Sequence, residues 1–287
     1  MSPSPQLPPV LADAHVHVHG CYPLPMFFDR AYTNLQEAAR ESGATGGFYG
    51  VLLLTEGAGE EAFTRFSGLA AAGAASDPGH GGWRFEPTAE DEAIVARNGG
   101  RSLVLVAGCQ VAAAEGLEVL CIGTRARTSD GRPIRDVLAF AREHDALPVI
   151  PWGAGKWLFG RAALLDRLID GASGAELFLG DESGRPFFWT TPRHFARGSA
   201  RGIRNLPGTD PLPFPHEAGR AGSFGFRLDA PLDLARPASG MKALLRDPSR
   251  EIATFGALEG ALAFVRNQVG MQLRKRRGAS HEAHSGA

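Results

Sequence analysis

Residues 10–19 read Val-Leu-Ala-Asp-Ala-His-Val-His-Val-His, and from position 13 they alternate polar and apolar side chains. A period of two predicts a β-strand, in which successive side chains point to opposite faces. Asp13 and the three histidines therefore share one face, and small apolar residues occupy the other. Burying such a polar row is unfavourable unless the groups have a purpose. The pattern predicts a polar site at the end of an inner strand; its alternative is the exposed face of an edge strand.

The spacing of these histidines suits a metal ion. Side chains at i and i+2 of a strand have Cα atoms about 6.5–7 Å apart, and two imidazoles at that spacing can converge on one ion at about 2.0–2.1 Å. Asp13 is placed to orient a histidine through its second ring nitrogen. The spacing therefore allows neighbouring histidines of this row to bind one metal ion together.

Outward from this strand, apolar patterns of period two and of helical spacing alternate along the chain. The alternation predicts an α/β fold with a largely parallel sheet, either a barrel or doubly wound. A dinucleotide-binding fold would need G-x-G-x-x-G after the first strand, where this chain has His-Gly-Cys-Tyr-Pro. The strands expected at Ser102–Ala107 and Leu117–Ile122 are separated by only about ten residues, which favours pairing as a hairpin.

Composition and net charge indicate which classes of partner the protein is expected to bind. The 287 residues carry a formal net charge of −1, and the isoelectric point is about 6.8, so we expect a small-molecule substrate and no nucleic acid. No apolar run approaches the roughly 18–20 residues that span a bilayer, so no membrane partner is expected. The widely spaced Cys21, Cys109 and Cys121 exclude a disulfide scaffold and favour a reducing cytoplasm. The oligomeric state is left open.

The domain organisation is predicted from local composition and apolar periodicity. Residues 1–9 are rich in Pro and Ser, without the basic and apolar regions of a signal peptide, and predict a flexible N-terminus. Residues 10–273 predict a single domain that ends in a long amphipathic helix. Residues 274–287 predict a disordered tail.

The ending of the first strand, Asp13-x-His15-x-His17, resembles the opening motif of the PHP phosphoesterase superfamily and of the wider amidohydrolase-like metal hydrolases. The resemblance implies a distorted (β/α) barrel of about seven strands, with His15 and His17 as ligands of the first metal. Two later segments are similar to family motifs: Gly108-Cys109-Gln110-Val111 to the G-x-E-x block, and Pro207-Gly208-Thr209-Asp210-Pro211 to the G-[ST]-D motif. The second match implies that Asp210 binds metal or activates water.

This chain also departs from the family pattern. Gln110 stands where the family has a ligating Glu, and we expect Glu115 to substitute for it. The mid-chain His is missing from residues 147–153, and Leu212 stands where PHP proteins often have another His. The resemblance therefore implies one or two divalent ions (Zn, Mn or Fe) rather than three.

Three more residues are candidates for the site. Lys156, one of only three lysines in a chain otherwise rich in Arg, is expected to bind a substrate anion or, as in amidohydrolase-like enzymes, to be carboxylated and bridge two metals. Asp181 and Arg185 follow a strand, where Asp181 would be a ligand or base and Arg185 an anion clamp. The alternatives are a surface lysine and an ordinary turn.

These inferences predict a metal-dependent hydrolase, with phosphoester hydrolysis favoured. Asp210 would act as the general base, while Lys156 and Arg185 would stabilise developing negative charge. The alternatives are amidohydrolase-type cleavage of a C–N or ester bond, a lyase or isomerase on the same scaffold, and a non-catalytic barrel that binds a small molecule or partner.

Overall fold

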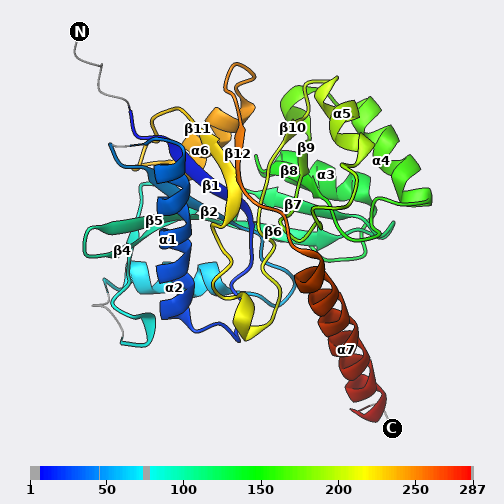
Figure 1. Cartoon of the computed structure of the whole chain (residues 1–287), viewed down its shortest axis with the longest axis horizontal. Coiled ribbons are helices and arrows are strands. Elements are labelled where there is room, and N and C mark those ends of the chain that lie inside the picture. The colour runs from blue at the N-terminus through cyan, green and yellow to red at the C-terminus, as the bar shows by residue number, and fades with distance from the viewer. Residues whose placement is uncertain (1–6, 45, 74–77, 286–287) are drawn as a thin grey trace.

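Residues 10–16 of the histidine-bearing segment form an inner strand of the first of two sheets in a computed structural model, which describes residues 7–44, 46–73 and 78–285 (Figure 1). The strand expected over residues 10–19 is therefore shorter than predicted, and His17 and His19 follow its end. The seven-stranded sheet has the order β12 (Ala253–Gly256), β11 (Phe224–Leu228), β1 (Val10–Val16), β2 (Tyr49–Leu54), β5 (Arg101–Val106), β4 (Ala93–Asn98) and β3 (Arg84–Pro87). The five-stranded sheet has the order β10 (Arg204–Asn205), β9 (Phe178–Gly180), β8 (Leu147–Pro151), β7 (Glu118–Ile122) and β6 (Gly108–Ala112).

The predicted (β/α) barrel is wrong: the described strands form two separate sheets and no closed barrel. Only the β1–β2, β2–β5, β8–β9 and β9–β10 pairs are parallel. From β3 to β8 neighbouring strands run antiparallel, because most of these connections are short turns rather than helical crossovers. The predicted pairing of residues 102–107 with 117–122 is also wrong, since β6 lies between them and pairs with β7.

The helices cover the outer faces of the two sheets. On the seven-stranded sheet lie α1 (Leu24–Glu41) and α2 (Ala62–Ala71); on the five-stranded sheet lie α3 (Ile134–Glu143), α4 (Gly160–Gly171) and α5 (Arg193–Ser199). The predicted helix at 26–41 is confirmed as α1, whose buried face repeats at helical spacing through Phe28, Ala31, Leu35 and Ala38. Because side chains alternate along each strand, those of one face pack against the helices and those of the other face pack into a separate core.

A third core lies between the sheets. Residues such as Ala12, Val51 and Val104 of the first sheet join Val149 and Phe178 of the second. The helix α6 (Pro237–Arg246) adds Met241 and Leu245 to this cluster. The inner core therefore holds the two sheets face to face, which brings the end of β1 close to the five-stranded sheet.

The last helix, α7 (Ala261–Ser285), projects from the body of the molecule (Figure 1). It extends through most of the segment 274–287, while residues 286–287 and 1–6 lie outside the described part of the chain. Among the described residues, no helix combines the length and the apolar character that crossing a bilayer requires.

Candidate metal centre

The site lies where β1 meets the segment 207–210 that follows β10. Ala14 N–H donates to the carbonyl of Pro207 at 3.1 Å, and Asp210 N–H donates to the carbonyl of His15 at 2.8 Å. The segment approaches so closely that a Cβ atom on Gly208 would lie 2.4 Å from the His15 nitrogen. Asp210 has a φ of 46°, a left-handed conformation that Asp tolerates better than most residues. This seam brings Asp210 beside the two histidines.

Three atoms able to bind a metal form a nearly equilateral triangle at the seam. His15 Nε2 and His17 Nε2 lie 3.2 Å apart, and Asp210 Oδ1 lies 3.5 and 3.6 Å from them. Two atoms bound at about 2.1 Å to one tetrahedral metal lie about 3.4 Å apart. The triangle therefore matches one face of such a coordination sphere, and this donor set suits a divalent transition metal.

A second group of possible ligands adjoins the first. Glu60, just before α2, places Oε2 2.9 Å from His17 Nδ1 and Oε1 2.6 Å from His19 Nδ1. Burial alone would raise the pKa of Glu60, but its hydrogen bonds with these histidines lower it overall. Sequence reasoning missed Glu60, because no motif marks it and it lies more than 40 positions from His17.

Gln110 and Glu182 complete the surroundings of His15. Gln110 Oε1 lies 2.8 Å from His15 Nε2 and 3.3 Å from His17 Nε2, so the amide oxygen of Gln110 faces the donor triangle. Glu182 Oε1 lies 3.2 Å from His15 Nδ1. Glu182 thus occupies the orienting position on the second ring nitrogen that the sequence analysis gave to Asp13.

Asp13 has a different role, in which it joins three segments of backbone. Its carboxylate accepts hydrogen bonds from Thr209 N–H at 2.9 Å, the Thr209 hydroxyl at 2.5 Å, Gly222 N–H at 2.8 Å and His15 N–H at 3.2 Å. The side chain is fully buried, and this burial raises the pKa of Asp13 to about 6 in spite of the hydrogen bonds. Asp13 therefore holds the 207–210 segment against β1.

Protonation in the absence of metal follows from burial and close charges. Burial lowers the pKa of His15, but the carboxylates of Asp210 and Glu182 outweigh it and raise this pKa to about 9. Burial and the charge of Asp210 raise the pKa of Glu182 to about 8. For Asp210 burial is opposed by His15, His17 and Lys156, which lower its pKa to about 2. A carboxylate so acidic suits a metal ligand better than a general base.

A polar cavity of about 480 Å³ opens above the triangle, and Lys156 lies in its wall. His17, Gln110, Glu182 and Asp210 also line it. The Lys156 ammonium pairs with Glu118; although burial lowers the pKa of Lys156, the charge of Glu118 raises it overall. Lys156 therefore stays protonated and faces the same space as the ligand atoms.

Three sequence-predicted residues lie apart from this cavity. Asp181 and Arg185 are both buried and pair with each other through two contacts of 2.8 and 2.7 Å, so each satisfies the other. Glu115 is exposed and accepts a hydrogen bond from Ile134 N–H at the start of α3. The side chain that turns toward His15 is Glu182, the neighbour of Asp181.

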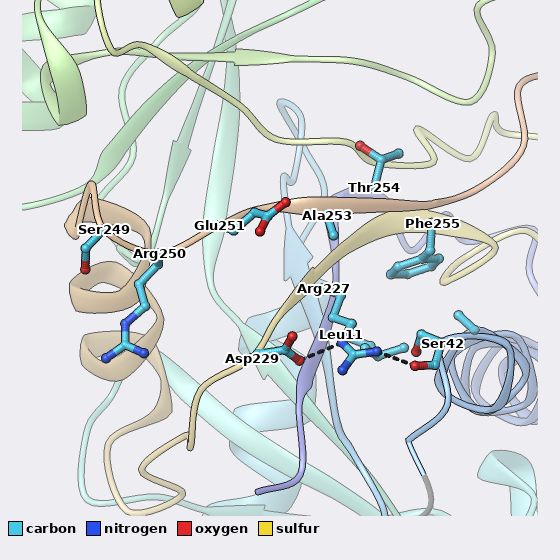
Figure 2. A pocket seen from close by; sticks show the side chains of 11 residues that line it. Leu11, Ser42, Arg227, Asp229, Ser249, Arg250, Glu251, Ala253, Thr254 and Phe255 are labelled. Atoms are coloured by element: carbon cyan, nitrogen blue, oxygen red, sulfur yellow. Dashed lines mark hydrogen bonds and ion pairs between the residues drawn. The ribbon is translucent and has the colours of Figure 1, made fainter. Parts of the chain in front are cut away.

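Another cavity, of about 450 Å³, lies between the end of α1 and the strands β11 and β12 (Figure 2). Figure 2 shows that Arg227 is already engaged by Asp229 and by the carbonyl of Ser42. Arg250, also in its wall, pairs with Asp247. Neither group of possible metal ligands found among the described residues lies in the wall of this cavity.

No known protein family matches the sequence, and no curated protein does. Among solved structures, PsfC from Pseudomonas syringae PB-5123 matches with a TM-score of 0.55 at 13% identity, over 93% of this chain and 99% of PsfC. This similarity shows a shared fold.

The lesion-specific endonuclease PfuEndoQ from Pyrococcus furiosus matches with a TM-score of 0.46 at 16% identity, over 84% of this chain and 57% of the endonuclease. A complex of endonuclease Q with a 27-mer duplex that carries an abasic lesion at the active site matches with the same values. At this TM-score the similarity assigns no substrate to this chain. Our expectation of no nucleic-acid partner is nevertheless withdrawn, because net charge alone gives no ground for that exclusion.

Proposed function

We propose that this protein is a divalent-metal-dependent hydrolase of phosphoesters. The observation that carries the proposal is the triangle of His15, His17 and Asp210, whose edges of 3.2, 3.5 and 3.6 Å match the separation of ligands around one ion. The motifs shared with PHP phosphoesterases support the same conclusion, because they supply these three residues.

Two carboxylates would prepare the histidines for coordination. Glu182 and Glu60 lie against the Nδ1 atoms of His15 and His17, at 3.2 and 2.9 Å. When a carboxylate accepts the Nδ1 proton, the Nε2 lone pair is free to ligate. Both Nε2 atoms face Asp210, so this arrangement selects the tautomer that a metal requires.

The bound ion would lower the pKa of a water molecule and polarise the ester that this water attacks. Lys156 would bind the phosphate, because its ammonium lies in the wall of the same cavity and stays protonated. A permanent cation favours an anionic ester over a neutral amide as substrate. Gln110 would hold the attacking water or a phosphate oxygen through its amide, since it lies beside both ligating nitrogens.

Metal content and hydrolysis test the proposal together. Tag-free protein is measured by plasma mass spectrometry and assayed on p-nitrophenyl phosphate and bis-p-nitrophenyl phosphate with Zn, Mn or Fe. We expect one to two ions per chain, and loss of both metal and hydrolysis in the His15→Ala, His17→Ala double variant. His144→Ala is the matched control, because His144 is exposed at the end of α3. Metal and rate that persist in the double variant would refute the proposal.

A further inference from the structure

An apolar cavity of about 260 Å³ adjoins the polar one. Three of the four tryptophans of the chain line it: Trp152, Trp157 and Trp189. Trp152 and Gly153, which follow β8, line both cavities, so the two spaces are neighbours along one wall. A ligand that reaches from the donor triangle into the apolar cavity would therefore pass Trp152.

The aromatic rings are held in place by the fold. Trp157 Nε1–H donates to the carbonyl of Pro151 at 3.0 Å, and its ring packs against Phe195 at 5.1 Å. The rings of Trp152 and Trp189 lie 6.0 Å apart at an angle of 77°. Trp189 in turn contacts Phe264 of α7 at 6.3 Å. A pocket whose rings are already fixed loses little conformational entropy when a ligand enters.

The rim of this cavity is apolar and open to solvent. Phe159 is 89% exposed, Leu158 41% and Trp189 37%. The charge at the rim is already paired, since Arg193 contacts Asp166 at 2.6 Å. Clustered exposed apolar side chains beside a polar site are typical of a surface that binds an apolar group.

We propose that this cavity binds a flat aromatic group of the substrate while the phosphate occupies the polar cavity. The assignment rests on the proposed function for the place of the phosphate. An aromatic ring fits better than an alkyl chain, because edge-to-face contacts with tryptophan add to the gain from burial alone. The substrate class is then a phosphoester whose organic part carries an aromatic ring close to the ester.

Two phosphoesters that differ only in aromaticity test the assignment. 2-Phenylethyl phosphate and 2-cyclohexylethyl phosphate have similar size and the same kind of primary alcohol as leaving group. We expect kcat/KM to be about fivefold to tenfold higher for the phenyl ester. Trp189→Ala should abolish this preference, and Trp189→Phe should restore much of it. Phe187→Ala is the control, because Phe187 is 67% exposed and does not line the cavity.

Binding without turnover separates this inference from the proposed function. Tryptophan fluorescence in the presence of EDTA gives Kd for both esters, since three of the four tryptophans line the cavity. Equal Kd and equal kcat/KM for the two esters would overturn the aromatic assignment, even if both are hydrolysed. Selective, Trp189-dependent binding of the phenyl ester without hydrolysis at any metal would support the cavity and overturn the hydrolase.

Discussion

Substitution of Gly208 by Ala tests whether the seam between β1 and the 207–210 segment builds the metal centre. The added Cβ would lie 2.4 Å from the nitrogen and 2.6 Å from the Cβ of His15. Ordinary contacts are close to 3.4 Å, so the segment must retreat by about 1 Å. The atoms that this Cβ meets belong to or adjoin the backbone of β1, so no flexible side chain can move aside to relieve the contact. Overpacking of this kind costs about 1–3 kcal/mol of folding free energy.

The same retreat would pull Asp210 away from the histidines. The three edges of the donor triangle differ by only a few tenths of an ångström, so a shift of about 1 Å removes Asp210 from bonding distance. Disturbed support of metal ligands commonly weakens affinity by about 10–100-fold, and we expect a loss of that size in Gly208→Ala.

Two measurements determine the stability and the metal affinity of this variant. Urea unfolding in EDTA gives the change in folding free energy without any contribution from metal, and competition with a chelator gives metal affinity. Gly171→Ala is the matched control, because no atom lies within 4 Å of its added Cβ and Gly171 lies at the end of α4, outside the cavity. If Gly208→Ala unfolds and binds metal like Gly171→Ala, the seam does not determine the site and the reasoning fails.

Three further outcomes are expected. Metal binding at pH 7 should release protons, because without metal the pKa of His15 is about 9 and that of Glu182 is about 8. Calorimetry in buffers of different ionisation enthalpy measures this release, and its absence would contradict the assignment of His15 as a ligand. The pKa of Asp13 rises from 3.8 to about 6 on folding, so the folded state retains a proton that the unfolded chain has lost, and stability falls as pH rises through this window. A pKa shift of about two units, at about 1.4 kcal/mol per unit, lowers the free energy of unfolding by about 3 kcal/mol across this window. Asp13→Asn should remove this pH dependence from urea unfolding curves, and an unchanged pH dependence would contradict the role given to Asp13. Arg185→Ala should cost about 3–5 kcal/mol by leaving Asp181 buried and unpaired, with metal affinity unchanged; an intact fold with lost activity would instead restore Arg185 to the site.

Local patterns predicted the parts of the site that neighbouring residues define. The alternation of residues 13–19 predicted a strand; β1 ends at Val16, but His15 and His17 still direct their Nε2 atoms to one point. Backbone periodicity acts over a few residues, so it can be recognised locally. Asp210, which the resemblance to the G-[ST]-D motif singled out, lies beside these histidines only because the fold brings residues 207–210 to the end of β1.

The arrangement of the strands could not be read in the same way. An alternation of strands and helices suggests parallel order, but short turns join β3 to β4, β4 to β5 and β6 to β7 and give antiparallel pairs. The pair β7–β8 is antiparallel although the helix α3 joins its strands. Turn lengths and long-range packing between the two sheets decide whether strands close into a barrel. The apolar pattern of each strand is compatible with either outcome.

The sequence by itself determined that His15 lies in a strand and that His17, two residues further along an extended chain, points the same way, because side-chain direction in extended backbone depends on position. Only the tertiary structure decided which carboxylates meet them. Asp181 and Glu182 are adjacent and chemically similar, yet Asp181 pairs with Arg185 and Glu182 lies against His15. Glu60 reaches His17 from the loop before α2. The role of a carboxylate depends on the groups that packing brings near it, and those groups come from distant parts of the chain.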